Sequence, residues 1–448
     1  MGTNEPGVYA PYLAESWELA PDKSYYDFHL RQGVKFHDGT DFDAHAAVFC
    51  LTQLKESTLP YLPTVTSVEA LDDYTIRLNL SEWNITILDD LALTETGMIS
   101  PTAFEKYGVD YMQTHPVGTG PFMFKEFVPR QTLTLEKFPD YWQEGKPYLD
   151  GIEITTIIDR TTCEFAFRSG ELHLLEEVDI PTAESVTKEG YPMGSLVFGG
   201  KMMLYFNSTD PDSVWSNQKV RQATEYAINK EEICQSLTMG YYPPSYEVVH
   251  GINQVGNPGT TPRKYNPEKA KQLLAEAGYP DGFKVDCLVN TKFNCDELIA
   301  VQEDLSEVGI DIDIQVLDGA KFNEVRFNVV PVNTVIFGRD QAGVGAIAIY
   351  TYENHRDDAI FFKGLKRPDA WSDLLLQCIH TESSAGQIAI LEEIERIGYE
   401  ELMHVPLWFK PNIDFFQPTV KWNPNEYEDF RFQGARPFPN WQYVWLEE

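Results

Sequence analysis

The stretch FKVDCLVNTKFNCDELIAVQEDLSEVGIDIDIQV, residues 283–316, decides the fold class. Residues 283–289 form a short apolar run typical of a strand, and residues 296–308 follow with a helical pattern that ends at Gly309. Residues 310–316, IDIDIQV, then alternate apolar and acidic side chains, as a half-buried strand does. Because strand–helix–strand order favours a parallel sheet with a crossover helix, this region predicts an α/β unit.

Helical patterns flank this α/β unit on both sides. Residues 217–239 carry apolar side chains at helical spacing, and residues 383–401 do the same further along the chain. Residues 267–277 begin with a proline at the first helical position and are followed by Gly278, a common helix stop. The later part of the chain therefore predicts a mixed α/β domain.

The opening third of the chain has shorter strands. Residues 25–34 and 68–80 carry strand patterns, and an Asp-Asp turn divides the second of these segments. Residues 36–40, FHDGT, contain the Asp-Gly pair of a tight turn. Residues 44–56 show helical spacing after Asp43, a residue suited to cap a helix. This order predicts a small α+β unit.

A glycine-rich loop separates that unit from the next strands. Residues 116–121, PVGTGP, lead into residues 122–138, whose two strand-like runs are broken at Pro129. A strand pattern at residues 152–158 and a short helical pattern at residues 161–169 follow. The end of the chain is rich in aromatic residues and proline, and it predicts irregular strand and loop.

The length and the charge of the chain limit its organisation and its partners. With 448 residues the chain is too long for one core and predicts two or three domains. Its 35 Lys and Arg against 69 Asp and Glu give a net charge of −34, which repels nucleic acid and anionic lipid headgroups. Such a charge keeps a protein soluble and also concentrates cationic ligands near a cleft. The aromatic content of 13% likewise fits either ordinary core or a ligand cleft.

Six cysteines are present, and none forms a CxxC pair. Cys287 and Cys295 lie close enough in sequence for a disulfide in an exported protein, and buried free thiols are the alternative. No run of eighteen apolar residues predicts a transmembrane helix. The first residues lack the basic start and apolar run of a signal peptide, so the protein is either cytosolic or its export segment lies outside this sequence.

The sequence contains no P-loop, HExxH or GxSxG motif. Gly118-Thr119-Gly120 resembles part of a nucleotide loop, but Pro121 and a strand follow it, so a tight loop between domains is predicted instead. The segment HDGTDFDAH, residues 37–45, has the residue types of a metal site, yet it lacks the glutamate of a calcium loop and is better explained by a turn and a helix cap. We therefore predict no catalytic residue, no cofactor and no metal ligand.

Several segments together resemble the bacterial extracellular solute-binding protein family 5, which serves peptide, nickel and related importers. LAESW at residues 13–17 and FHLRQGVKFHDGT at residues 28–40 are similar to the signature region of that family in order and spacing. The further similar segments are HPVGTGPFMFKEF (115–127), KFPDYWQEGKPYLDGIEI (137–154), LYFNSTDPDSVWSNQKVRQATEYAINKEEI (204–233), YNPEKAKQLLAEAGYPDGF (265–283) and residues 308–316. The similar segments span most of the chain.

The resemblance implies a mixed α/β fold of the periplasmic-binding-protein type II class. Two lobes are expected to enclose the ligand and to be joined by crossing strands near residues 204–207 and 404–409. The expected division is an extra subdomain at 17–113, the rest of lobe one at 1–16, 114–208 and 404–448, and lobe two at 209–403. Family members carry a β-rich segment before the LAESW region, so the first lobe is expected to be truncated here.

The resemblance also points to ligand-binding residues. In peptide-binding members, an acid in a Trp-containing stretch that is followed by Asp-Tyr and Pro pairs with the free amine of the ligand. The comparable region here, residues 335–352, lacks that Trp and Pro and has Asp340 as its nearest acid. Its neighbour Arg339 is suited to hold a carboxylate by a two-pronged contact. The remaining candidates adjoin the crossings: Tyr205, Asn207, Trp408 and Phe409. A purely structural role is the alternative for each of the six.

The function implied is that of an extracytoplasmic substrate-binding protein of an ABC importer, which captures a small solute by hinge closure. A peptide is the expected ligand, with a sugar, a metal chelate or an amine-bearing compound as alternatives. The expected partner is the membrane permease of the importer, and nucleic acid is excluded. The protein is expected to be a monomer, periplasmic or anchored to the cell surface as a lipoprotein. The alternatives are a chaperone or sensory receptor with the same fold, or a hydrolase that uses paired carboxylates.

Overall fold

The computed structural model describes residues 2–5, 8–56, 62–92, 96–194, 199–248, 261–293, 295–328, 330–341, 363–422 and 441–447. These residues form two compact units, each with its own sheets. Unit 1 holds the described residues up to 194 and from 412 onward, and unit 2 holds those from 199 to 411. The C-terminal part of the chain therefore returns to the unit in which the chain began.

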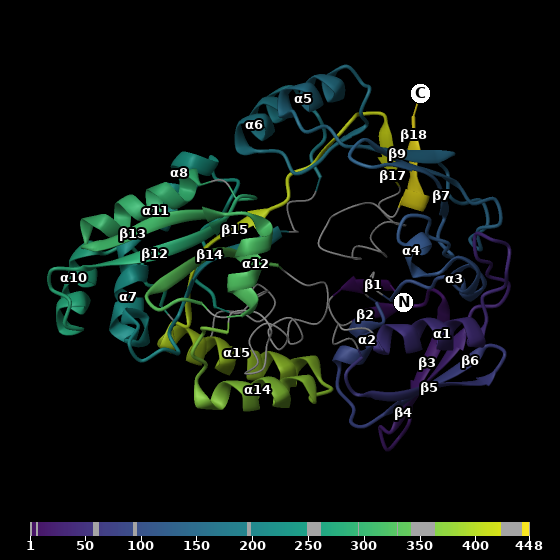
Figure 1. The fold of residues 1–448 in the computed structure, drawn as a ribbon, viewed down its shortest axis with the longest axis horizontal. Coiled ribbons are helices and arrows are strands. Elements are labelled where there is room, and N and C mark those ends of the chain that lie inside the picture. Colours follow the sequence, from purple (N-terminus) through teal and green to yellow (C-terminus); the bar gives the residue numbers. More distant parts are fainter. Residues whose placement is uncertain are drawn as a thin grey trace. The chain divides into compact units, whose positions relative to one another are not determined.

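A five-stranded mixed sheet forms the centre of unit 2, in the order β13-β12-β14-β11-β15 (Figure 1). Its strands are β11 (Gly199–Phe206), β12 (Phe283–Asn290), β13 (Ile310–Leu317), β14 (Thr334–Gln341) and β15 (His404–Pro411). β12 runs parallel to β13 and β14, while β11 is antiparallel to β14 and β15. The parallel pair β12–β13, joined through α11 (Asp296–Glu307), confirms the α/β unit predicted for residues 283–316.

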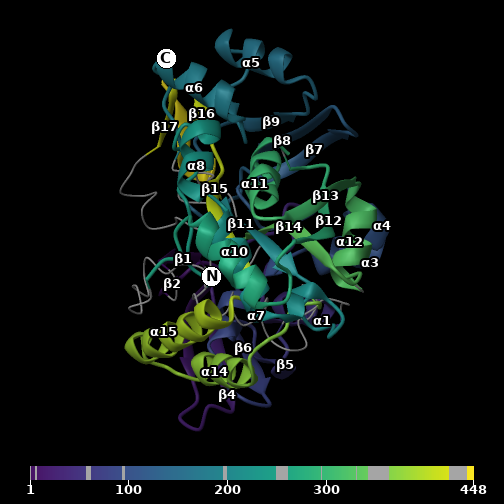
Figure 2. The same cartoon turned by 90° about the vertical axis from the view of Figure 1, so that its left-hand side faces the viewer.

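Helices cover both faces of this sheet, and Figure 2 shows α11 and α12 (Gly319–Phe327) on opposite sides of β12 and β13. The other helices of unit 2 are η2 (Val214–Ser216), α7 (Gln218–Ala227), α8 (Lys230–Thr238), α10 (Pro267–Glu276), α14 (Asp369–Ile379) and α15 (Ser384–Glu401). The region predicted as helical at residues 217–239 forms two helices, because Ile228 has an extended backbone and the side chain of Asn229 caps α8. Two-sided coverage accounts for buried strands such as residues 201–206 of β11.

A four-stranded antiparallel sheet and α1 (Ala44–Lys55) share one core at the N-terminal side of unit 1. The sheet order is β3-β4-β6-β5, with β3 (Ala14–Leu19), β4 (Tyr25–Leu30), β5 (Val65–Asp72) and β6 (Thr75–Leu80). The side chain of Asp43 accepts a hydrogen bond from Ala46 N at 2.9 Å, so Asp43 caps α1 as predicted. The predicted turn is also present, because Phe36 N donates to Thr40 O at 2.8 Å.

The second sheet of unit 1 is antiparallel and has the order β7-β8-β9. Its strands are β7 (Phe122–Val128), β8 (Thr132–Lys137) and β9 (Gly151–Thr155). The shorter elements of unit 1 are β1 (Gly2–Glu5), β2 (Val8–Ala10), α2 (Thr86–Asp90), α3 (Pro101–Tyr107), α4 (Val109–Met112), α5 (Arg160–Arg168), β10 (Leu174–Leu175), α6 (Ile180–Lys188), β16 (Phe415–Phe416), β17 (Val420–Trp422), η4 (Trp441–Tyr443) and β18 (Val444–Leu446). All of β8 is only half-buried, so the described residues cover this sheet incompletely.

The chain passes between the two units twice, and the residues that flank these two connections are neighbours within each unit. In unit 2, β11 and β15 are antiparallel neighbours, with Gly199 opposite Pro411. In unit 1, Gly194 N donates to Asp414 O at 2.8 Å, and the side chain of Asp414 accepts from Glu177 N at 2.8 Å. The two connections therefore start from neighbouring residues in each unit.

The boundaries between the units differ from the predicted lobe boundaries. In the prediction, lobe two begins at residue 209 and ends before residue 404. In the structure, the chain passes from unit 1 to unit 2 between residues 194 and 199 and returns to unit 1 after residue 411. The reason is that β11 and β15 belong in full to the unit 2 sheet. The lobes as functional bodies, and the subdomain at 17–113, stay predictions. All six cysteines are free, so Cys287 and Cys295 form no disulfide in this structure.

Candidate functional site

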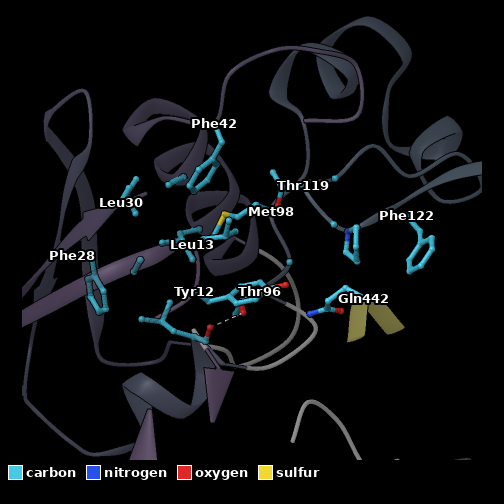
Figure 3. Close-up of a pocket in the computed structure, with 18 of the residues that line it drawn as sticks. Tyr12, Leu13, Phe28, Leu30, Phe42, Thr96, Met98, Thr119, Phe122 and Gln442 are labelled. Atoms are coloured by element: carbon cyan, nitrogen blue, oxygen red, sulfur yellow. Dashed lines mark hydrogen bonds between the residues drawn. The ribbon is translucent and has the colours of Figure 1, made fainter. Parts of the chain in front are cut away.

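A cavity of about 570 Å³ lies within unit 1 and is the candidate functional site (Figure 3). Its lining comes from β3 and the residues before it, from β4, α1 and β6, from the loops at residues 96–98 and 118–121, from β7, β8 and β9, and from residues 441–442. These segments are far apart in the sequence, and folding brings them together. The volume falls in the range of about 300–1,000 Å³ that is typical of small-molecule sites.

One side of the cavity borders the apolar core of unit 1. Phe28, Phe42 and Leu78 line it and are at most 3% exposed. Figure 3 shows Phe28, Leu30 and Phe42 on one side of the cavity and Phe122 and Gln442 on the other. The cavity thus lies between this core on one side and the glycine-rich loop and the C-terminal segment on the other.

His37 fixes the glycine-rich loop of the cavity wall. Its Nδ1 accepts a hydrogen bond from Gly118 N at 3.3 Å, so its Nε2 carries the proton and donates to Gly120 O at 3.0 Å. The backbone of His37 also donates to Gly118 O at 2.8 Å. One imidazole therefore holds a donor and an acceptor that lie two residues apart in the loop. The two predicted motifs, FHDGT and PVGTGP, form one hydrogen-bonded structure.

The protonation state of His37 is part of this arrangement. Desolvation lowers its pKa, while the hydrogen bond to Gly120 and the charge of Asp38 oppose that shift. Protonation of Nδ1 would remove the acceptor for Gly118 N. The neutral ring is therefore the form that keeps the loop in place.

The aspartates around His37 accept hydrogen bonds that stabilise a turn and cap a helix. Asp38 accepts from the hydroxyl of Thr40 at 2.6 Å and from that of Ser100 at 2.5 Å, which ties the turn to the start of α3. Asp43 caps α1. Within the described part of the chain no group of three or more His, Cys, Asp and Glu side chains is arranged to hold a metal ion. The explanation of residues 37–45 as a turn and a helix cap is confirmed.

The predicted ligand-binding residues all lie in unit 2, on or directly after its strands β11, β14 and β15. Arg339 of β14 and Trp408 of β15 are both opposite Met202 of β11, so the three side chains belong to one row on one face. Arg339 is half-buried, while Trp408 is 1% exposed and packs 6.1 Å from the ring of Phe337. The sheet thus places these two predicted residues in one row, on either side of Met202.

The other four predicted residues are placed as follows. The amide of Asn207 donates to Val330 O at 2.8 Å and holds the segment that precedes β14. Tyr205 is buried, with its ring 5.5 Å from that of His404. Phe409 is half-buried and lies opposite Lys201. Asp340 also pairs with Lys201 through its backbone, but its side chain and residues 342–352 lie outside the described residues. A ligand-binding role for each of the six stays a prediction.

No pattern in the sequence predicted the cavity or the burial of the lysine in β11. Lys201 is 3% exposed and donates to Glu247 O at 2.6 Å. The available signal was a single lysine inside the apolar run of residues 199–206. No comparable signal existed for the cavity, because it is lined by segments that the chain order does not connect. Among the described helices, none combines the length and apolar character needed to cross a bilayer.

Comparisons with known proteins agree with this architecture. The family model for bacterial extracellular solute-binding proteins, family 5 Middle, matches residues 8–340. The glutathione-binding protein GsiB of Salmonella paratyphi A is 31% identical over 318 residues, which cover 69% of this chain and 61% of that protein. The chain thus spans only part of the length of the curated relatives that it matches.

Solved structures show the same fold. The periplasmic binding protein DppA from Helicobacter pylori, in complex with the peptide STSA, superposes with a TM-score of 0.83 at 25% identity and covers 100% of this chain and 90% of its own. The binding protein AgaA from A. tumefaciens R10, in complex with agropinic acid, gives 0.79 at 25% identity, over 98% and 90% of the two chains. The fold is that of the type II periplasmic binding proteins, and the chain belongs to the bacterial extracellular solute-binding proteins of family 5.

Proposed function

We propose that this chain is the solute-binding subunit of an ABC importer and that it captures a peptide or similar small solute by hinge closure. The observation that carries the proposal is the pair of neighbouring connections between the units, within a chain that belongs to a solute-binding family. Gly199 faces Pro411 in unit 2, and Gly194 bonds to Asp414 in unit 1. Adjacent connections allow bending through a few backbone torsions, as hinge motions require.

The ligand class follows from the similar proteins and from the unit 2 sheet. The relatives are named for glutathione, and the two solved structures hold a peptide and agropinic acid. All three are small, polar and carry carboxylate groups. The half-buried Arg339, in the same row as Trp408 with Met202 between them, is suited to such a ligand, because a guanidinium holds a carboxylate with two parallel hydrogen bonds. We propose a carboxylate-bearing peptide or amino-acid conjugate.

The partner and the location follow from the same proposal. The subunit delivers its solute to the membrane permease of the importer and acts in the periplasm or at the cell surface. The net charge of −34 is in keeping with a protein that avoids nucleic acid and anionic lipid surfaces. We propose that it acts as a monomer.

Mass spectrometry followed by calorimetry tests the proposal. The purified protein is first denatured, and any released small molecule is identified. The protein is then titrated with that compound, with glutathione, with tri- and tetrapeptides and with metal chelates. We expect one solute to bind one-to-one and Arg339→Met to weaken it by about tenfold or more, while Arg396→Met on exposed α15 leaves binding unchanged. Turnover of the compound would indicate a hydrolase instead, and preference for unfolded chains would indicate a chaperone.

A further inference from the structure

Three segments of unit 1 meet at the residues that flank the two connections, and Asp414 in one of them bonds to the other two. Its carboxylate accepts a hydrogen bond from Glu177 N at 2.8 Å, and its backbone carbonyl accepts one from Gly194 N at 2.8 Å. Val178 N also donates to Ile413 O at 3.0 Å. We call these three segments the junction, and they are residues 177–178, 192–194 and 413–416.

The junction is closely packed. Asp414 and Phe416 are each 3% exposed, and Phe416 N donates to Pro192 O at 2.9 Å. A Cβ atom at position 194 would lie 3.2 Å from the ring of Phe416 and 3.5 Å from Asp414 O, and the first of these distances is shorter than most contacts that a Cβ atom makes. Gly194 therefore lets the residue before the first connection lie directly against the residues after the second.

The carboxylate of Asp414 also holds an uncommon backbone conformation. Glu177 has a φ of 48°, in the left-handed region that residues other than glycine rarely adopt. Such a conformation persists only where the surrounding structure fixes it, and the hydrogen bond from Glu177 N to Asp414 is one of the contacts that do so. The third segment of the junction is thus fixed by the residue that follows the second connection.

One residue therefore ties together the unit 1 ends of both connections. Gly194 precedes the first connection and Asp414 follows the second, so neither end can shift within unit 1 without breaking a bond to the other. Two ends that moved independently would let the units sample more orientations in the absence of solute. The fraction of molecules ready to close would fall, and the apparent affinity for the solute would fall with it.

We propose that Asp414 is the positioning residue of hinge closure and that it couples the two connections so that they bend together. The proposal rests on the proposed solute capture and adds a residue that acts on it from unit 1, whereas the predicted ligand residues all lie in unit 2. A change at Asp414 should therefore alter capture through the connections.

Asp90 provides a matched control. It is also 3% exposed, belongs to unit 1 and accepts a hydrogen bond from a backbone amide, Leu62 N, at 3.0 Å. Asp414→Ala and Asp90→Ala each leave a buried amide without this acceptor, so both should lower the melting temperature. Only Asp414→Ala should change the coupling, and Asp414→Asn, which retains an acceptor oxygen, should behave as the wild-type protein.

Distances between spin labels test the coupling without solute. Cys163 of unit 1 and Cys295 of unit 2 are partly exposed and the other four cysteines are buried, so each unit can be labelled in the native sequence. We expect double electron–electron resonance to give a broader distance distribution for Asp414→Ala than for the wild-type protein and for Asp90→Ala. Equal widths for the two alanine variants would overturn the proposal.

Calorimetry with glutathione and tetrapeptides tests the effect on capture. We expect Asp414→Ala to weaken binding by at least about tenfold, while Asp90→Ala and Asp414→Asn stay within about twofold of the wild-type protein. Equal weakening by both alanine variants would show a structural role alone and would refute the assignment. If the wild-type protein binds none of these solutes, the proposed function fails, and the distance measurement still decides whether Asp414 couples the connections.

A second variant perturbs the junction from the side of the first connection. Gly194→Ala places a Cβ atom against Phe416 and Asp414, so it should broaden the distance distribution and weaken binding as Asp414→Ala does. Gly319→Ala is the control, because a Cβ atom there has no neighbouring atom closer than 3.9 Å, and it should leave both measurements unchanged. An unchanged distance distribution for Gly194→Ala would contradict the coupling.

Discussion

The sheets of the two units are buried to different extents. In unit 2, helices lie on both faces, and the first five residues of β15 are buried in succession. In unit 1, every residue of β8 is half-buried, and a cavity extends from this sheet into the N-terminal core. A sheet covered on both faces packs to a uniform density, whereas partial coverage leaves space that a ligand can use. The described cavity therefore lies in the unit whose second sheet is only half-buried.

The polar groups buried in the two units differ in the same way. Unit 2 buries a charged network in which Glu225 bonds to Lys230 at 2.9 Å and to Arg263 at 3.1 Å, with Glu225 and Lys230 fully buried. Burial lowers the pKa of Lys230, and the charge of Glu225 opposes that shift. Unit 1 instead buries separate carboxylates: Asp90 accepts from Leu62 N at 3.0 Å, and Asp414 accepts from Glu177 N at 2.8 Å. Unit 2 thus pairs its buried charges with one another, whereas these two carboxylates of unit 1 accept hydrogen bonds from backbone N–H groups.

The largest change in the free energy of unfolding is expected from Glu225→Gln in unit 2. The change leaves Lys230 and Arg263 buried without their common counter-ion, which should lower the free energy of unfolding by about 3–5 kcal/mol. Urea denaturation followed by circular dichroism measures it. Glu268→Gln, which removes an exposed pair with Lys271, is the control and should change the value by no more than about 0.5 kcal/mol. A similarly small effect of Glu225→Gln would refute the assigned role of the network.

A matched pair of alanine substitutions tests the packing contrast. Ala223 in α7 and Ala47 in α1 are both fully buried, but only Ala47 lines the cavity. Ala223→Met should overpack unit 2 and cost about 1–3 kcal/mol of unfolding free energy. Ala47→Met adds the same volume at a residue of the cavity wall, so it should cost less unfolding free energy than Ala223→Met. Equal losses in the same urea experiment would show that the two cores are packed alike.

Thiol labelling compares the opening of the two units directly. Cys50 of unit 1 and Cys287 of unit 2 are both buried, and burial raises the pKa of Cys50 to about 11 and that of Cys287 to about 12. In a protein whose partly exposed Cys163 and Cys295 are replaced by serine, we expect Cys50 to be alkylated first, by about tenfold or more in rate, because unit 1 opens at lower cost. Mass spectrometry of digested samples gives both rates. If Cys287 is alkylated before Cys50, unit 2 opens more readily than unit 1, which would contradict this expectation.

The smallest expected effect is the contribution of His37 to the pH dependence of the unfolding free energy. An unfolded histidine titrates near pH 6.5, and burial lowers the pKa of His37 in the folded protein. The unfolded chain therefore binds more protons between these two values, so stability falls as pH decreases below about 6.5. His37→Gln should flatten this slope by no more than about 1.4 kcal/mol per pH unit in urea titrations from pH 7 to 5. The exposed His45→Gln is the control, and an unchanged slope for His37→Gln would contradict the arrangement.

Local elements of both units were predictable from sequence because short-range chemistry determines them. The cap at Asp43, the turn at residues 36–40 and the parallel strands around α11 all follow from patterns a few residues long. The family resemblance was equally available, because it rests on contiguous motifs. The complete inclusion of β11 in the unit 2 sheet depends on its pairing with the distant β15, which no local pattern in the sequence shows.

The site was less predictable because it depends on contacts between distant segments. His37 resembled a metal ligand in sequence, and only the fold brings Gly118 and Gly120 to its two nitrogens. Gln442 had no distinguishing neighbour in the sequence. Among the predicted ligand residues, the amide of Asn207 already holds the backbone of Val330, which the sequence could not show.

The central claim, solute capture by hinge closure, is tested most directly by small-angle X-ray scattering during titration with the solute identified by mass spectrometry. The radius of gyration is measured with and without saturating solute, and calorimetry supplies the stoichiometry. The account predicts one-to-one binding with a decrease in the radius of gyration, because the two connections permit the units to close. Saturating binding with an unchanged radius of gyration would contradict hinge closure, and a folded protein that binds none of the peptides or conjugates would contradict the proposed function.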